Sequence, residues 1–244
     1  MGKTAMKTPG FRSGLAAIVF AMLFPTLLTW VYFVAMADRS ESAQQLTYSV
    51  GKVIQFGFPI FFFVVCQRRR PDWRWPSTQG IGLGFGFGLL VVAAMFACFF
   101  FVLKPFGLFE QANVELQKKV EGFGLDSVWA FVGLGLFYSL FHSFLEEYYW
   151  RWFVFGQLRQ WSSFSVATIL SSLGFMAHHV IVLAVYFGWD SPLTYLLSIS
   201  VAVGGAVWAW IYERTKTLYS PWLSHLVVDA GIFLLGYEIL KRSL

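Results

Sequence analysis

Long apolar runs alternate with short polar segments along the whole chain. The runs cover residues 14–37, 48–66, 80–103, 128–158, 165–187, 193–212 and 221–240. Each is about 20 residues or longer, which at ~1.5 Å per residue in a helix is enough to cross a hydrocarbon layer of ~30 Å. The pattern predicts an all-α fold, a polytopic transmembrane helical bundle of about seven membrane helices, or eight if one run is split.

The longest polar stretch falls between the third and fourth runs. Residues 104–126 mix charged and apolar side chains, a composition typical of an amphipathic helix that lies in the membrane interface. This stretch divides the chain into residues 1–127, the N-terminal membrane helices with their amphipathic connector, and residues 128–244, a helical core that holds the candidate chemistry. Both parts are expected to form one integral-membrane domain.

The composition changes the interpretation of the charge. Hydrophobic residues make up 57% of the chain and charged residues 13%, whereas charged residues make up roughly 25% of an ordinary soluble domain. A multi-pass integral membrane protein is expected, with the lipid bilayer as its partner. The net charge of +5 would suggest nucleic acid in a soluble protein. Here the Lys and Arg residues flank apolar runs and set orientation, so no nucleic-acid partner is expected.

The basic residues are divided unequally between the two ends of the predicted helices. If the N-terminus and the turns near residues 70, 160 and 215 share one side of the membrane, that side holds ten Lys and Arg residues: Lys3, Lys7, Arg12, Arg68, Arg69, Arg70, Arg74, Arg159, Arg214 and Lys216. The other side holds six: Arg39, Lys104, Lys118, Lys119, Lys241 and Arg242. Lys52 and Arg151 are left out as intramembrane residues. Because cytoplasmic loops carry an excess of Lys and Arg, the N-terminus is predicted to be cytoplasmic.

One charged cluster lies inside an apolar run rather than between runs. Glu146, Glu147 and Arg151 all fall within residues 128–158, and ionisable side chains at bilayer depth are costly and usually functional. Glu147 and Arg151 are four positions apart on one helical face, so they are expected to pair. Glu146 points ~100° away and is left free. A purely structural ion pair between Glu147 and Arg151 stays an open alternative.

Two histidines are predicted to lie at the depth of Glu146. The fourth and fifth runs turn near residue 161, and Glu146 and His179 lie so nearly the same distance from that turn that their depths differ by only ~3 Å. His225 follows a turn on the same side and lies at a compatible depth. Three helices can therefore present Glu146, His179 and His225 to one point inside the membrane.

These residues belong to three short motifs in series. The motifs are Glu146-Glu147-x-x-x-Arg151, Phe175-x-x-x-His179 and His225-x-x-x-Asp229. In their order, spacing and transmembrane setting they resemble the motifs of the CPBP family of membrane proteins, which includes the type II CAAX prenyl endopeptidases, bacteriocin-processing enzymes and Abi-like proteins. The resemblance covers residues 128–236.

The resemblance implies an intramembrane endopeptidase, a metal-independent glutamic protease that hydrolyses a peptide bond with a glutamate-activated water. It implies Glu146 as the general base, His179 as its partner in holding the water, and His225 with Asp229 as the oxyanion-stabilising pair. The implied supporting residues are Glu147, Arg151 and Phe175. No cofactor and no metal are implied. The implied substrate is a peptide or membrane protein, processed in CAAX-type or leader-peptide fashion, and whether it is lipid-modified stays open.

Elementary chemistry agrees with these roles. Apolar surroundings make a carboxylate a stronger base, which suits proton transfer from water and then to a leaving amine. A fixed imidazole aimed at a developing oxyanion gives stabilisation that a low dielectric strengthens. Where the family has Asn or Asp, this chain has Asp229. An ionised Asp229 cannot donate to an oxyanion, so it is expected chiefly to orient His225.

Two nearby histidines have less specific roles. His142 lies one helical turn before Glu146 and could hydrogen bond to it, although a packed histidine is the favoured interpretation. His178 is ~100° around the helix from His179, and the spacing from Phe175 selects His179.

Other functions stay open at this point. Glu146, His179 and His225 are a chemically reasonable zinc ligand set for a membrane metallopeptidase, but no His-Glu-x-x-His helix is present in the sequence. The chain could also be a non-catalytic membrane scaffold or immunity-type protein, or a proton-coupled transporter that uses the same buried acid. A transporter would more often show matching half-sequences with broken helices, and none is seen.

Overall fold

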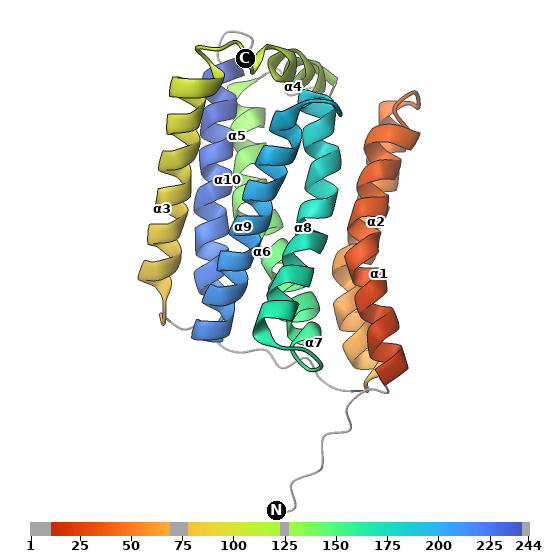
Figure 1. Cartoon of the computed structure of the whole chain (residues 1–244). Helices are drawn as coiled ribbons and strands as arrows, with labels where there is room; N and C mark the ends of the chain where they lie inside the picture. Colours follow the sequence, from red (N-terminus) through yellow and green to blue (C-terminus); the bar gives the residue numbers. More distant parts are fainter. Residues whose placement is uncertain (1–10, 69–77, 123–126, 241–244) are drawn as a thin grey trace, which may run out of the picture.

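The chain is helical throughout the part that the structure describes. The structure is a computed structural model and describes residues 11–68, 78–122 and 127–240. These ranges hold helices and turns and no strand, which confirms the predicted all-α class (Figure 1). In chain order the helices are α1 (Phe11–Trp30), η1 (Val31–Ala35), α2 (Glu41–Phe61), η2 (Phe62–Cys66), α3 (Ile81–Cys98), η3 (Phe99–Leu103), α4 (Glu110–Gly122), α5 (Val128–Phe137), η4 (Tyr138–His142), α6 (Ser143–Glu147), η5 (Tyr148–Phe155), α7 (Gly156–Leu158), α8 (Phe164–Phe187), α9 (Pro192–Thr215) and α10 (Tyr219–Leu240), where η marks a π-helical segment.

Among the described residues, seven continuous helices are long and apolar enough to cross a membrane, as predicted. They cover Gly14–Ala35, Glu41–Cys66, Ile81–Leu103, Val128–Leu158, Phe164–Phe187, Pro192–Thr215 and Tyr219–Leu240. The predicted ends agree to within a few residues, except that the second helix begins at Glu41 instead of residue 48. Its first two turns are polar and were therefore missed, but a helix satisfies its backbone hydrogen bonds internally and can continue beyond the apolar window.

Successive spans run in opposite directions. The start of α1, the turn after α7 and the turn between α9 and α10 lie at one end of the bundle, and α4 lies across the other end (Figure 1). This is the alternation that the orientation prediction assumed. Several of its basic residues lie outside the described residues: Lys3, Lys7, Arg69, Arg70, Arg74, Lys241 and Arg242. The cytoplasmic N-terminus stays a prediction.

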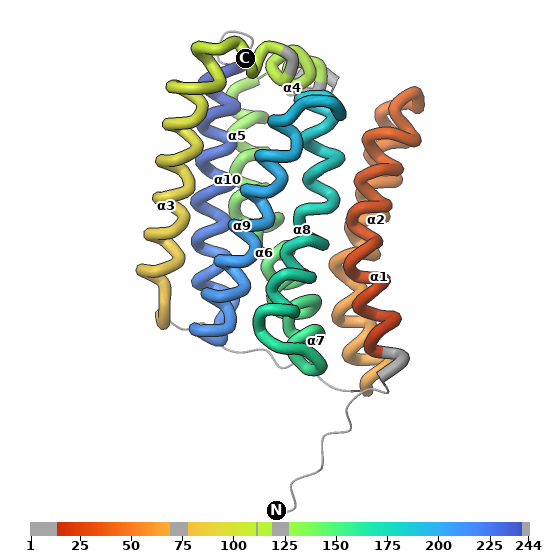
Figure 2. Tube along the Cα trace, viewed as in Figure 1, coloured from red at the N-terminus to blue at the C-terminus, as the bar shows by residue number. Residues whose placement is uncertain are grey.

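The last helix is held in place by close packing against α3. A side chain at Gly84 would collide with the backbone carbonyl oxygen of Ser220, and one at Gly88 would come within 2.9 Å of the carbonyl oxygen of Ser224. Small residues let two membrane helices approach closely without a polar driving force. Figure 2 shows α3 and α10 running side by side over most of their length. This contact fixes the helix that carries His225 and Asp229.

The fourth span lies at the centre of the core. Its side chains Tyr149, Trp150, Arg151 and Phe153 are all fully buried. The Tyr149 hydroxyl donates a hydrogen bond of 2.8 Å to the backbone carbonyl of Ala21, which ties η5 to α1. The cluster predicted from the sequence is therefore enclosed by other helices.

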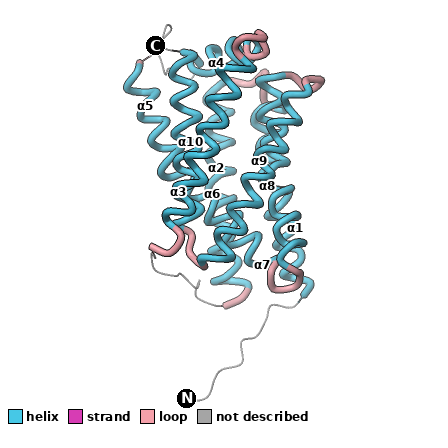
Figure 3. The backbone as a smooth tube through the Cα atoms, turned by 60° about the vertical axis from the view of Figure 1, so that its left-hand side comes forward, coloured by secondary structure: helices cyan, strands magenta, loops and turns pink. Residues whose placement is uncertain are grey.

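The fourth span also changes helix type on either side of the two glutamates. It remains one helix along its length (Figure 3), but the α-helical turn α6 is flanked by the π-helical segments η4 and η5. A π-helical turn uses i→i+5 hydrogen bonds, is rare, and is often found at functional sites. The wider turns alter which side chains share a face, so α-helical spacing holds only within short pieces of this span.

Candidate active site

The two glutamates and the arginine of the predicted cluster are buried. Glu146 is 4% exposed, and Glu147 and Arg151 are 0% exposed. Arg151 Nε donates a hydrogen bond of 3.1 Å to Oε2 of Glu147, so the predicted pair is present. A buried ion pair is favourable only when further hydrogen bonds satisfy its remaining atoms.

The second oxygen of Glu147 supplies such a bond. Oε1 lies 3.0 Å from Nδ1 of His225 on α10, and because a carboxylate only accepts, this ring nitrogen donates. The indole of Trp208 stacks on the His225 ring, with centroids 4.2 Å apart and planes inclined by 15°. Arg151, Glu147 and His225 thus form one hydrogen-bonded chain from η5 to α10. The sequence predicted the first link of this chain but not the second.

Aromatic rings enclose the other end of the arginine. Within the described part of the chain, Nη1 and Nη2 of Arg151 have no hydrogen-bond partner. Its guanidinium carbon lies 5.1 Å from the ring centroid of Phe175 and 5.6 Å from that of Trp208, distances typical of cation–π contacts. Phe175 also packs against His179, with centroids 4.7 Å apart.

Glu146 is surrounded by imidazoles at longer distances. Its Oε1 lies 3.7 Å from Nε2 of His178 and 3.9 Å from Nε2 of His142, and its Oε2 lies 3.7 Å from Nε2 of His225. These separations exceed the ~3.2 Å limit of an ordinary N–H···O hydrogen bond, so the contacts are electrostatic. The hydrogen bond considered between His142 and Glu146 is therefore absent from this arrangement.

His178, and not His179, is the α8 histidine that contacts Glu146. Nδ1 of His179 donates a 2.8 Å hydrogen bond to the backbone carbonyl of Phe175 in its own helix, and the predicted role of His179 in holding the water stays a prediction. His178 is buried and stacks on Trp150, with centroids 5.9 Å apart and planes inclined by 8°. The stacking on Trp150 holds the His178 ring on the side of α8 that faces Glu146.

Asp229 approaches the other nitrogen of His225. Its Oδ1 lies 3.5 Å from Nε2 of His225, the same nitrogen that faces Glu146. The sequence predicted that Asp229 would orient the ring. In the structure the shorter contact, and the hydrogen bond, come from Glu147 on the opposite nitrogen.

Residues 128–231 match a family model described as "Type II CAAX prenyl endopeptidase Rce1-like". This segment is similar to that family, and it is called the Rce1-like segment below. The match includes all three motifs and confirms the predicted resemblance to the type II CAAX endopeptidases. No curated protein and no solved structure matches the chain. Together with the seven apolar helices, the match identifies a multi-pass integral membrane protein and indicates a protease.

The Rce1-like segment does not assemble the alternative zinc ligand set. Across residues 11–68, 78–122 and 127–240, no group of three or more His, Cys, Asp or Glu side chains is arranged to hold a metal ion. His179, whose Nδ1 is bonded to its own helix, does not join Glu146 and His225 in such a group.

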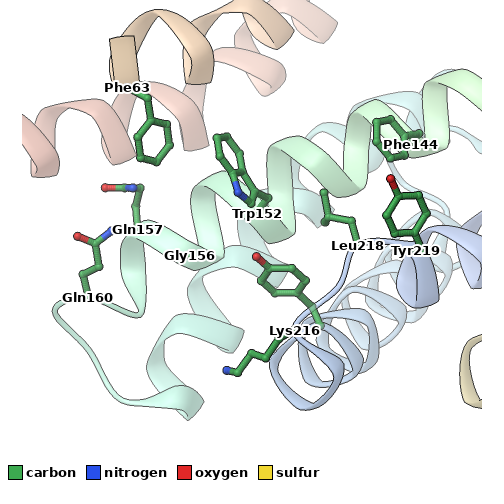
Figure 4. Close-up of a pocket in the computed structure, with 10 residues that line it drawn as sticks. Phe63, Phe144, Trp152, Gly156, Gln157, Gln160, Lys216, Leu218 and Tyr219 are labelled. Carbon is green, nitrogen blue, oxygen red and sulfur yellow. The ribbon is translucent and has the colours of Figure 1, made fainter. Parts of the chain in front are cut away.

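A pocket of about 290 Å³ opens on another face of the Rce1-like segment (Figure 4). Its lining residues are Phe63, Phe144, Trp152, Gly156, Gln157, Gln160, Tyr212, Lys216, Leu218 and Tyr219. Phe144 is two positions from Glu146 and thus ~200° around the helix. The pocket is therefore separate from the candidate active site.

Proposed function

We propose that this protein is an intramembrane endopeptidase in which Glu146 activates a water molecule for attack on a peptide bond. The observation that carries the proposal is the environment of Glu146. It is a buried carboxylate in an Rce1-like segment, it makes no hydrogen bond to another described residue, and three imidazoles lie within 3.9 Å of it. A carboxylate held in this way remains available to a substrate water, as a general base must be.

The proposed reaction uses Glu146 twice. As the water oxygen bonds to the carbonyl carbon, Glu146 takes one proton from the water, and the carbonyl oxygen becomes an oxyanion. When the tetrahedral intermediate collapses, the carbon–nitrogen bond breaks and Glu146 gives the proton to the leaving amine. One water is consumed, and a carboxylic acid and an amine are released. No covalent enzyme intermediate is required.

His225 is the proposed donor to the oxyanion. Its Nδ1 is hydrogen bonded to Glu147, which leaves Nε2 directed toward Glu146 and Asp229. Carboxylates beside both ring nitrogens supply counter-charge to the imidazolium form, in which both nitrogens are donors. A donor fixed by a hydrogen bond and by the stacked Trp208 needs little reorganisation during the reaction, which favours electrostatic catalysis.

On the other side of Glu146, His178 is the proposed partner that helps to hold the water. The distance of 3.7 Å to Glu146 favours it over His179. The motif spacing from Phe175 favours His179 instead, and substitution of each histidine in turn distinguishes the two assignments.

Glu146→Gln tests the mechanism, because glutamine matches the shape of glutamate but cannot act as a base. The purified protein in lipid nanodiscs is incubated with a mixed-sequence library of quenched-fluorescent peptides, and the cleavage rate is measured. We expect the variant to lose about 10²–10⁴-fold of the rate while keeping its helix content and thermal unfolding temperature. The matched control is Glu41→Gln, at the exposed start of α2.

Full activity of Glu146→Gln would overturn the glutamate mechanism. Activity that disappears in protein shown by elemental analysis to be metal-free, and returns with zinc, would favour the metallopeptidase. Inactivity of the wild type toward every peptide would favour a scaffold or immunity-type protein.

The substrate class and orientation belong to the same proposal. We propose a peptide or membrane-protein substrate, processed in CAAX-type or leader-peptide fashion, and an N-terminus in the cytoplasm. Proteomics of membranes that contain the wild type or Glu146→Gln would name the substrate by the uncut species that accumulate in the variant. Cysteine labelling from either side of the membrane at an introduced Ser162→Cys would settle the orientation.

A further inference from the structure

A second intramembrane cation lies at the level of the candidate active site. Lys52 is on the second span, which runs in the same direction as the fourth. Lys52 precedes the end of its span, Cys66, by ~21 Å, and Glu146 precedes Leu158 by ~18 Å, at ~1.5 Å per residue. The two side chains therefore start from depths that differ by about 3 Å.

Contacts connect Lys52 to the carboxylate. Its Nζ lies 5.3 Å from the ring centroids of both Tyr48 and Phe56. The Phe56 ring packs edge-on against His142, with centroids 6.0 Å apart, and His142 lies 3.9 Å from Glu146. The ammonium group thus lies beside two aromatic rings, one of which, Phe56, packs against a histidine that neighbours Glu146.

Lys52 lacks the partner that the other intramembrane cation has. Arg151 is paired with Glu147, whereas no carboxylate of the described residues lies within 4.0 Å of the Lys52 ammonium group. A cation inside a membrane protein is costly, is usually paired, and marks a functional site by default. The nearest carboxylate by depth, Glu146, is the one that the proposed reaction needs free.

We propose that Lys52 binds a carboxylate of the peptide substrate and thereby directs cleavage to peptide bonds near that group. This inference rests on the proposed endopeptidase function. A peptide bond itself carries no charge, and the anions that a peptide brings are its C-terminal carboxylate and its Asp or Glu side chains. A substrate carboxylate would meet the ammonium group in a low dielectric, where such a charge-assisted hydrogen bond is strong.

The C-terminal carboxylate is the favoured source. It is present on every peptide, and a lysine acts as a point charge that does not demand the planar two-pronged geometry of an arginine site. Lys52 would then favour cleavage of peptide bonds close to the C-terminus. Its role is in substrate specificity, separate from the water chemistry of Glu146.

The test crosses one change in the peptide with one change in the protein. A mixed-sequence quenched-fluorescent library is made in three forms: with a free C-terminal acid, with a C-terminal amide, and with a C-terminal amide preceded by Glu. Cleavage of each form is measured as kcat/KM for the wild type, Lys52→Met, Lys52→Arg and a control. The control is Lys104→Met, because Lys104 also lies over an aromatic ring, 5.5 Å from Phe100, but directly after the last residue of a different span.

We expect the wild type and Lys104→Met to cleave the free-acid library about 10- to 100-fold faster than the amide library, the range for a charged hydrogen bond. Lys52→Met should lose this preference and still cleave the amide library at the wild-type rate, which also shows that it is folded. Lys52→Arg should keep part of the preference. Faster cleavage of the Glu-containing amide library than of the plain amide would assign the site to side-chain carboxylates as well.

Two results would overturn the inference and leave the endopeptidase proposal intact. One is equal cleavage of the acid and amide libraries by the wild type. The other is an equal fall in both rates in Lys52→Met, which would mean that Lys52 acts on Glu146 or on folding. Absence of cleavage in all three libraries would instead contradict the proposed function itself.

Discussion

Two carboxylates one residue apart are held in opposite ways by this fold. Glu147 uses both oxygens in direct hydrogen bonds, 3.1 Å to Arg151 and 3.0 Å to His225. Glu146 has three imidazoles around it, none of them closer than 3.7 Å. Both glutamates are buried, but only one is held by hydrogen bonds. We call Glu147 and its partners Arg151 and His225 the locked side of the site. Glu146 and the imidazoles around it are the open side.

The difference shows how adjacent residues of one membrane helix can have a structural role in one case and a proposed catalytic role in the other. The chain of Arg151, Glu147 and His225 joins η5 to α10 and fixes one imidazole, so Glu147 belongs to the framework. Glu146 lies ~100° away from that framework and faces ring nitrogens that can donate or accept.

The largest effect is expected from breaking the locked side. Arg151→Met would leave Glu147 buried without its counter-charge, and removal of one partner of a buried ion pair typically costs about 3–5 kcal/mol of stability. We expect loss of activity and a marked fall in the unfolding temperature, measured by intrinsic fluorescence in detergent micelles.

The double variant Glu147→Leu with Arg151→Met sharpens this comparison. Replacing both charges removes the unpaired carboxylate, so most of the stability should return. Activity should not return, because His225 has lost the hydrogen bond to its Nδ1. If Glu146→Gln lowered the unfolding temperature as much as Arg151→Met, the distinction between a locked and an open carboxylate would be wrong.

A smaller effect is expected on the open side, from the two adjacent histidines of α8. His178→Asn removes an imidazole 3.7 Å from Glu146 and should lower kcat about 10²-fold or more. His179→Asn removes a ring bonded to its own backbone and should lower kcat less than about 10-fold, chiefly through packing against Phe175. The measurement is kcat for both variants on one peptide library. The reverse order would restore the assignment made from the Phe-x-x-x-His spacing.

These two histidines also show what the sequence could and could not predict. The spans were predictable because a helix that faces lipid must be apolar over its whole length, so each span appears in the sequence as one apolar run. The pair of Glu147 and Arg151 was predictable because the two residues are about one helical turn apart. The choice between His178 and His179 depends on how α8 is rotated, and the stacking of His178 on Trp150, a residue of another helix, holds the His178 ring on the side that faces Glu146.

The hydrogen bond between Glu147 and His225 could not be predicted from the sequence for a related reason. It joins residues 78 positions apart, and its geometry depends on the rotation of two helices at once. The π-helical segments η4 and η5 add to the difficulty. The direction of a side chain around the helix axis, predicted with 3.6 residues per turn, is wrong by a further amount after each π-helical segment. The helices that carry the site were predictable, but the arrangement of its side chains around the helix axes was not.

The smallest effect is expected where the two sides meet, at Asp229. Its Oδ1 lies 3.5 Å from Nε2 of His225, the nitrogen that also faces Glu146. Because Glu147 already holds Nδ1, Asp229→Asn should keep His225 oriented and lower kcat by less than about 10-fold. Asparagine also adds an amide donor where the oxyanion is proposed to form, which partly compensates for the lost charge. Complete loss of activity, measured on the same library with Tyr237→Phe at an exposed position of the same helix as a control, would mean that the negative charge of Asp229 is itself required. His225 would then depend on the carboxylates of both Glu147 and Asp229, and Asp229 would belong with Glu147 among the residues that fix His225.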